Sequence, residues 1–180
     1  MRNPWAKRLL LGAMVAAGVA VAPEAEAQYK NGQIGFEAGY FFLGEEGLLD
    51  QHAFLVALRG AYKASDHWWF TARAGVSFRG EPQLSEKTVV LFHLTPIDAR
   101  YYFATDRLRP FVGLTNSFQF LFNNSTDSTV WWGPGVVAGL EIFLRRDMFL
   151  GIQADTSWMF VFEGPDVPMV TTTAQILFFL

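Results

Sequence analysis

The chain contains no cysteine. This absence excludes a disulfide-stapled secreted domain, a lipoprotein held by a lipidated cysteine, thiolate metal sites and thiol catalysis. Histidine is also scarce: the three in the chain, His52, His67 and His93, are too scattered to predict a metal site, and no cofactor is expected. Packing and hydrogen bonds alone must hold the fold together.

The sequence has little that could form a membrane-spanning helix. An apolar run over 9–22 follows a basic start and stops at Pro23, short of the roughly 20 residues that cross ~30 Å of hydrocarbon. Ala25-Glu26-Ala27 fits a small-x-small cleavage site. We therefore predict a cleaved secretory signal peptide over 1–27, in preference to a membrane anchor, and one domain over 28–180.

An excess of positive charge is also missing. The chain has 14 Lys and Arg against 17 Asp and Glu, a formal net charge of −3, which gives no reason to expect a nucleic-acid partner. What is abundant is apolar surface: 51% of the residues are hydrophobic and 18 are Phe, a high content for a soluble protein.

Apolar residues alternate with small or polar ones along most of the chain, which is the pattern of β-strands. In 33–42, Ile34, Phe36 and Tyr40 share one face while Gln33 and Glu37 share the other. The same contrast recurs in eight segments, so the prediction is an all-β, eight-stranded antiparallel up-and-down barrel. The predicted strands are 33–42, 53–62, 68–79, 88–103, 111–122, 132–142, 150–162 and 170–180.

The fourth segment is irregular. Ile97 and Ala99 continue one apolar face, whereas Val90 and Phe92 have the opposite parity. A β-bulge at Pro96 would account for this change of face. The expected connections are 63–67, 104–109 and 145–147 at one end, and 43–50, 80–86, 123–129 and 163–168 at the other.

The composition of the two faces distinguishes a soluble, lipocalin-like barrel from a transmembrane one. An eight-stranded barrel has an interior just wide enough for side chains, so it cannot hold all the bulky residues of one face. With that face outward, large apolar groups meet lipid, and Gly, Ala, Ser and Thr leave room inside. We therefore predict a transmembrane barrel, with aromatic girdles near the strand ends formed by Tyr62, Trp68, Phe103, Phe122, Trp132 and Trp158.

Two local segments resemble a known family. The first is Arg100-Tyr101-Tyr102-Phe103, a short turn and Arg107-Leu108-Arg109-Pro110-Phe111-Val112-Gly113, and the second is 135–141 in the next hairpin. Both resemble the strand–turn–strand units of small bacterial outer-membrane β-barrels of the OmpA-like or OmpX-like type. The resemblance covers everything after residue 27. It implies an outer-membrane location, a short turn at the periplasmic end of each hairpin, and an anchoring or envelope role more often than a pore. Leu180 departs from the aromatic residue that usually ends these chains.

The face predicted to line the lumen carries charges. A narrow lumen makes an unpaired charge costly, so these groups are expected to pair with one another as a structural plug, or to exchange partners along a gated ion path. The predicted ion-pair network is Glu37, Arg59, Arg73, Asp98, Arg100, Glu141 and Asp155, with Gln119, Gln153 and Gln175 as further polar lumen groups.

Three functions compete at this point. The first is a structural or surface-interaction protein of a Gram-negative envelope, expected as a monomeric barrel in outer-membrane lipid, with contacts to other envelope proteins left open. The second is a narrow pore, or a carrier of small solutes or hydrophobic molecules. The third is a lipid-modifying enzyme, which needs a serine beside a histidine base and an orienting acid. Only Ser85 and His93 suggest such a pair, so no catalysis is expected.

Overall fold

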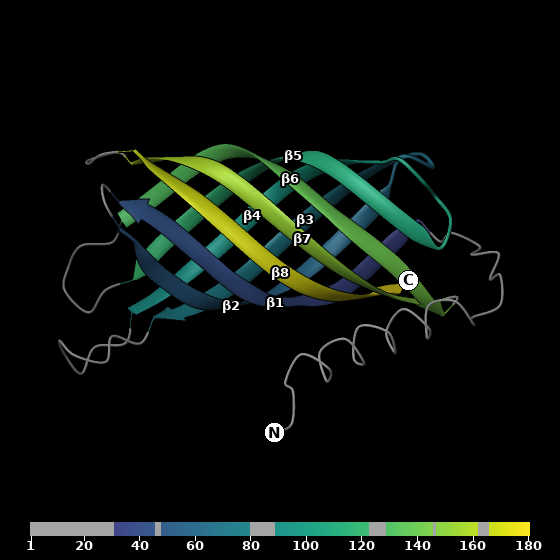
Figure 1. Ribbon diagram of the computed structural model, residues 1–180, viewed down its shortest axis with the longest axis horizontal. Helices are drawn as coiled ribbons and strands as arrows, with labels where there is room; N and C mark the ends of the chain where they lie inside the picture. The colour runs from purple at the N-terminus through teal and green to yellow at the C-terminus, as the bar shows by residue number, and fades with distance from the viewer. Residues whose placement is uncertain (1–30, 46–47, 80–88, 123–128, 146, 162–165) are drawn as a thin grey trace, which may run out of the picture.

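The structure is a computed structural model that describes residues 31–45, 48–79, 89–122, 129–145, 147–161 and 166–180. The predicted signal peptide therefore lies outside the described residues. Eight strands follow one another along the chain (Figure 1). They are β1 (Gly32–Glu45), β2 (Leu48–Lys63), β3 (Trp68–Arg79), β4 (Val89–Tyr102), β5 (Leu108–Phe122), β6 (Thr129–Arg145), β7 (Met148–Val161) and β8 (Val167–Phe179). No helix among the described residues is long and apolar enough to cross a membrane.

Each strand pairs antiparallel with its neighbours in sequence, and β1 pairs with β8 to close the barrel. Glu37 on β1, for instance, lies opposite Ala57 on β2 and opposite Gln175 on β8. The tilted strands enclose one central axis in Figure 1. Closure pairs the backbone of both β1 and β8 and leaves no sheet edge, which is what a hydrocarbon environment requires. The predicted eight-stranded antiparallel barrel is confirmed.

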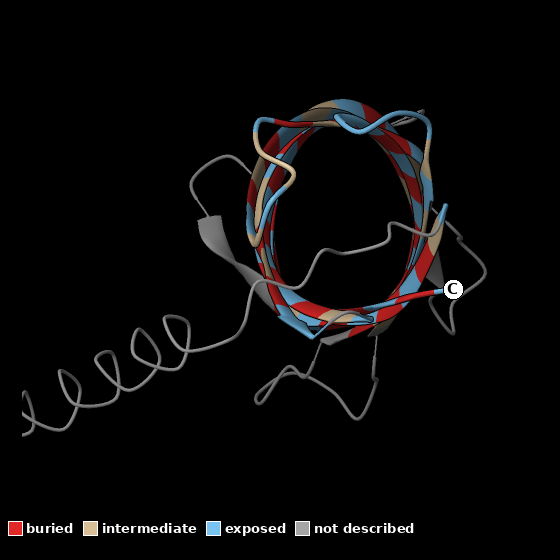
Figure 2. Ribbon diagram, turned by 90° about the vertical axis from the view of Figure 1, so that its right-hand side faces the viewer, coloured by how far each residue is buried: buried red, intermediate tan, exposed pale blue. Residues whose placement is uncertain are grey.

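Buried and exposed residues alternate along the strands, as the end-on view in Figure 2 shows. The bulky face points outward, as predicted: the side chains of Phe36, Leu114 and Ile152 are 57%, 68% and 63% exposed. Glu37, which directly follows Phe36 on β1, points inward and is 1% exposed. The barrel thus presents apolar side chains outside and places its charged side chains inside, the reverse of a soluble barrel.

The bulge predicted at Pro96 is present. The β3–β4 register shifts between Thr71 and Arg73, and the β4–β5 register shifts between Leu94 and Ile97. Thr95 and Asp98 are consequently both buried in the lumen, although three positions separate them. Proline has no backbone N–H to donate to the ladder, so the bulge occurs where a hydrogen bond would be lost in any case.

Most strand boundaries differ from those predicted, and β3 is the strand that has both predicted bounds; β6, β7 and β8 each begin two or three residues earlier than expected. The 43–50 segment was expected to be a connection, but β1 continues to Glu45 and β2 begins at Leu48. Polar strand ends obscure the alternation there. Arg109 was placed in a turn and instead lies in β5, whereas Phe103 was placed in a strand and lies just beyond β4.

Inward glycines make room for large neighbours, as the sequence suggested. A Cβ atom on Gly139 would lie 2.5 Å from Cζ of Phe111, and one on Gly151 would lie 2.4 Å from Nε2 of Gln175. Each distance is far below van der Waals contact. Glycine is therefore required at position 139, where a ring and a backbone carbonyl both approach closely, whereas at position 151 the flexible Gln175 side chain can move aside.

Aromatic residues collect on the outer wall near the strand ends. Tyr101 packs against Trp68 and Phe103, with ring centroids 5.3 and 5.5 Å apart, and Trp132 stacks on Phe160 at 5.7 Å. The predicted girdle residues Tyr62, Trp68, Phe103, Trp132 and Trp158 are all exposed. The side chain of Phe122 lies outside the described residues. This arrangement suits the two interfaces of a membrane.

The connection between β2 and β3 is held by its own polar contacts. Lys63 Nζ lies 2.6 Å from Oδ1 of Asp66, and this hydrogen bond together with the lysine charge lowers the pKa of Asp66 below its ordinary value. A lowered pKa in the folded state means that the pair stabilises the turn above the ordinary pKa and that this contribution is lost as the pH falls through the lowered one. Asp66 is solvent-exposed, so the contribution is small.

Candidate functional site in the barrel lumen

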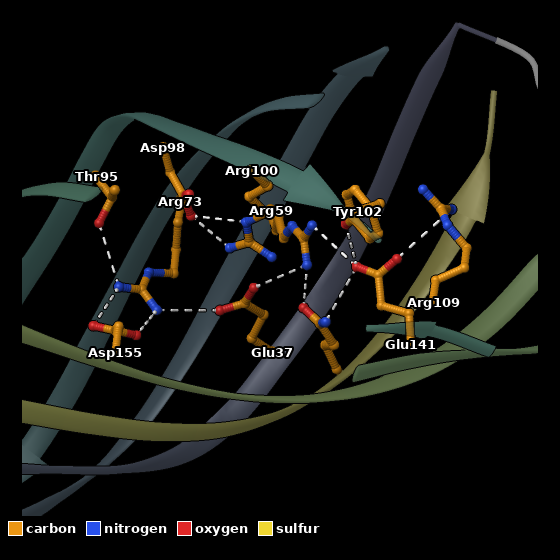
Figure 3. Close-up of polar contacts among 11 residues, drawn as sticks. Glu37, Arg59, Arg73, Thr95, Asp98, Arg100, Tyr102, Arg109, Glu141 and Asp155 are labelled. Atoms are coloured by element: carbon orange, nitrogen blue, oxygen red, sulfur yellow. Dashed lines mark hydrogen bonds and ion pairs between the residues drawn. The ribbon is translucent and has the colours of Figure 1, made fainter. Parts of the chain in front are cut away.

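All seven charged residues predicted for the lumen face inward, and none is more than 8% exposed. They come from six strands, β1, β2, β3, β4, β6 and β7, and Figure 3 shows them converging on the barrel interior. The period-2 pattern brings each side chain to the inner face. Barrel closure then brings the strands within contact distance across the lumen.

Arg73 is the centre of one group of contacts. Its Nη1 atom lies 3.1 Å from Oδ2 of Asp155 and 3.5 Å from Oε2 of Glu37. Its Nη2 atom donates to Oδ1 of Asp155 at 3.4 Å and to the Thr95 hydroxyl at 3.4 Å. The guanidinium therefore bridges β1, β4 and β7.

Arg59 is the centre of the second group. Its Nη1 atom lies 3.8 Å from Oε1 of Glu37 and donates a hydrogen bond to the Gln175 side-chain carbonyl, while its Nη2 atom lies 3.3 Å from Oε1 of Glu141. Glu37 is shared by both arginines, one on each carboxylate oxygen (Figure 3). Of the described carboxylates, it is the one that joins the two groups.

Asp98 and Arg100 form a more local pair on β4. The Arg100 Nε atom donates to Oδ2 of Asp98 at 3.0 Å, and the guanidinium carbon lies 4.7 Å from the centre of the Phe111 ring. Alternate residues of a strand point to the same face, so these two side chains are neighbours in the lumen.

Arg109 also belongs to the network and was missed, because it was assigned to a turn. Its Nη1 atom lies 3.7 Å from Oε2 of Glu141, and its guanidinium lies 4.1 Å from the Tyr102 ring and 5.0 Å from the Trp69 ring. Arg109 lies two positions before Phe111 and therefore points to the same face of β5, an alternation in the sequence that could have predicted its inward position. With Arg109, the buried charges among the described residues are four carboxylates and four arginines, a balanced set.

The three predicted glutamines have different surroundings. Gln175 is within the network, where it accepts from Arg59 and donates to Oε1 of Glu141 at 3.4 Å. Gln119 donates to the sulfur of Met169 at 2.8 Å, away from the charges. Gln153 faces the lumen but makes no hydrogen bond to a described residue.

Two apolar layers bound the network along the barrel axis. We call the end that holds the start of β1, the end of β8 and the β2–β3 connection the turn end, and the opposite end the loop end. The turn-end layer consists of Trp69, Tyr102, Phe111, Val137, Phe143, Phe149, Leu177 and Phe179. The loop-end layer consists of Phe41, Ala53, Leu91, Met159, Val167 and Met169.

Apart from Arg109, whose guanidinium lies among the rings of the turn-end layer, the charges lie between these layers. On β7, Asp155 lies between Met159 and Phe149; on β4, Asp98 and Arg100 lie between Leu91 and Tyr102. Tyr102 links the turn-end layer to the network, because its hydroxyl donates to Oε1 of Glu141 at 2.8 Å. The described lumen is thus filled by three successive layers, apolar, charged and apolar.

One Ser–His contact occurs that the sequence did not suggest. Ser77 Oγ lies 2.7 Å from Nε2 of His93, and the Phe41 ring packs edge-on against the imidazole. Ser85, the serine considered from the sequence, lies outside the described residues. No described carboxylate is hydrogen-bonded to His93, and the described residues hold no cluster of three metal-ligating side chains. The orienting acid of a catalytic triad is therefore not part of this contact.

Comparison with known proteins bears on the fold. No protein-family model matches the sequence, and no curated protein is similar to it in sequence. Among solved structures, neisserial surface protein A (NspA) is 14% identical with a TM-score of 0.69, and the alignment covers 84% of this chain and 98% of that one. The chain has the fold of the small outer-membrane β-barrels.

Two further structures support this conclusion. The N-terminal β-barrel domain of Pseudomonas aeruginosa OprF is 17% identical, with a TM-score of 0.56 and coverage of 84% of this chain and 98% of that one. Ail, the attachment invasion locus protein of Yersinia pestis, crystallised with the heparin analogue sucrose octasulfate, is 15% identical, with a TM-score of 0.55 and coverage of 83% and 99%. The likeness spans nearly the whole length of each of these barrels.

Proposed function

We propose that this protein is a monomeric, non-catalytic barrel of the Gram-negative outer membrane, with a structural or surface-interaction role and a plugged lumen. The observation that carries the proposal is the filling of the barrel, in which a network of balanced charges occupies the middle of the lumen and an apolar layer lies toward each end. An ion crossing this interior would have to leave its hydration shell at both apolar layers.

The exterior supports a place in lipid. Apolar side chains such as Phe36, Leu114 and Ile152 cover the outer wall, and an unpaired arginine there would cost ~2–4 kcal/mol at mid-bilayer. The shared fold with NspA, OprF and Ail supports the same location. We infer that residues 1–27 direct export and are removed.

A surface-interaction role is supported by analogy with two of these barrels, a neisserial surface protein and an attachment invasion locus protein. The loop-end connections of this chain have nine residues or fewer between strands. Short connections favour a compact contact with a neighbouring envelope component over an adhesin built from large loops.

Planar-bilayer recording tests the plugged lumen directly. Purified barrel should insert without discrete openings over a wide range of voltage and salt, whereas steady single-channel openings would favour the pore. The matching structural control is gel migration with and without boiling: the folded barrel should migrate differently before boiling. A preparation that passes this control and still conducts would contradict the plug but not the barrel.

A further inference from the structure

The outer wall of the barrel is not evenly covered by bulky side chains. A groove with a volume of about 710 Å³ crosses it between β3 and β8, and its surface is almost entirely apolar. Three outward alanines, Ala99, Ala138 and Ala154, lie along the groove and leave space that larger side chains would fill. The larger outward residues that line it are Trp68, Tyr101, Val112, Leu114, Val136 and Val170.

The groove rises from the turn end toward the middle of the barrel. Trp68 is the first residue of β3, and its partner Tyr101 is next to the last residue of β4. From Tyr101 the paired positions lead across β5 to Ala138 and Ala154, which lie near the middles of β6 and β7. In a membrane the groove therefore begins among the interfacial aromatic residues and continues into hydrocarbon.

Only an apolar group can fill this groove in a membrane, because water is absent at that depth. A lipid acyl chain is flexible and can follow the row of small side chains. A second copy of the protein fits less well: a two-fold dimer centred on this patch would set the groove against the same groove of its partner and leave both empty. The shape of the groove therefore favours an acyl chain.

The turn-end mouth of the groove carries an exposed histidine. The His67 ring stacks on Tyr101 with centroids 5.5 Å apart, and its Nδ1 atom donates to the Tyr102 carbonyl at 2.7 Å. Because a carbonyl only accepts, the neutral imidazole has its free lone pair on Nε2. Nearby, Lys63 and Asp66 pair with each other and add no net charge. These side chains therefore suit a headgroup that donates a hydrogen bond better than an anionic one.

We propose that the groove is a binding site for one phospholipid with a primary ammonium headgroup. An acyl chain lies along Ala138 and Ala154, the glycerol region lies beside Trp68 and Tyr101, and the ammonium donates to Nε2 of His67. A quaternary ammonium has no N–H group and cannot form this bond. The inference rests on the proposed outer-membrane location and adds a lipid partner, but it does not depend on the plugged lumen.

Native mass spectrometry of the wild-type barrel measures which lipid stays bound after the detergent is removed. Phosphatidylethanolamine, phosphatidylcholine and phosphatidylglycerol with identical chains are compared at equal concentration. The barrel should retain one phosphatidylethanolamine, with an affinity roughly threefold to tenfold above that for the other two lipids, as expected for one hydrogen bond. Equal retention of all three lipids would overturn the proposed headgroup contact.

Three variants separate the groove from its mouth. Ala138→Phe fills the groove and should abolish lipid retention, whereas Ala74→Phe, on the outer wall of β3 away from the groove, is the matched control and should bind as the wild type does. His67→Phe keeps a ring against Tyr101 and should remove only the preference for phosphatidylethanolamine. Unchanged retention in Ala138→Phe, or a wild-type dimer that carries no lipid, would overturn the site.

Heat-dependent gel migration shows whether each variant is folded, and the wild-type comparison of lipids needs no variant. A folded, non-conducting barrel that retains no lipid would reject the lipid site and leave the proposed function standing. A barrel that retains phosphatidylethanolamine and also conducts would do the reverse: the lipid site would stand and the plugged lumen would fail.

Discussion

Glu37 connects two arginines that come from different strands, and its contribution to the stability of the fold comes from this position between them. With Oε1 toward Arg59 and Oε2 toward Arg73, one carboxylate compensates two buried positive charges. Removing one member of a buried ion pair leaves the partner uncompensated in a medium that solvates it poorly. Residues of this kind are costly to alter even when they take no part in chemistry.

Glu37→Gln should therefore lower the free energy of unfolding by about 3–5 kcal/mol, because both arginines lose a charged partner. The measurement is urea-induced unfolding of the barrel in lipid vesicles. Asp66→Asn is the matched control: it removes an exposed carboxylate paired with Lys63 and should have little effect. Equal stability of the two variants would show that the Glu37 pairs are solvated.

Arg109 illustrates a different residue-scale effect, since a flat guanidinium lies among aromatic rings. Arg109→Lys keeps the charge but replaces the planar group with a compact ammonium, which stacks poorly on Tyr102 and Trp69. We expect a loss of about 1–2 kcal/mol, measured by the same urea titration. Arg145→Lys, an exposed arginine near the end of β6, should be neutral. A neutral result for Arg109→Lys would mean that charge alone is required there.

At the scale of the strand, alternation determines which face each residue occupies. It predicts the inward position of Glu37, Arg73 and Asp155, and also the change of face at Pro96. Alternation does not predict which residues meet across the lumen. That depends on how far along the barrel axis each side chain lies, which is set by strand tilt and stagger and not by the alternation. The apolar layers and the place of Arg109 follow from that geometry.

The Pro96 bulge gives a strand-scale prediction. Deleting Pro96 should still allow folding, because it removes the extra residue of the bulge and leaves Thr95 inward, Ile97 outward and Asp98 inward in plain alternation. Heat-dependent gel migration after refolding measures this outcome. Deleting Thr105, in the connection after β4, changes no strand register and should leave folding intact. A Pro96 deletion that abolishes folding would show that the bulge itself is required, and not only the faces that it gives to the residues on either side.

Close packing of adjacent strands provides a second prediction at this scale. Gly139→Ala puts a Cβ atom 2.5 Å from both the Phe111 ring and the Ile152 carbonyl, so backbone and ring must both move. We expect a loss of about 1–3 kcal/mol in urea unfolding. Gly60→Ala, whose Cβ would meet no atom within 4 Å, should instead be neutral or stabilising by a few tenths of a kcal/mol. Equal effects at the two glycines would contradict the close approach.

For the whole molecule, the consequence of layering is that two apolar barriers lie in series. Phe41→Ala thins the loop-end layer and Phe149→Ala thins the turn-end layer, but either variant keeps the other layer intact. In planar-bilayer recordings, each single variant should therefore stay closed, while the double variant should show openings, because water can then reach the charged layer from both ends.

The control for this experiment is the double variant Phe36→Ala and Phe70→Ala, which removes two exposed rings from the outer wall and should stay closed. Openings in a single lumen variant would show that one apolar layer alone closes the barrel. A closed double lumen variant would assign the barrier to the ion-pair network. In that case, adding Glu37→Gln to the double variant should open it, because Glu37 joins the Arg59 and Arg73 groups across the lumen.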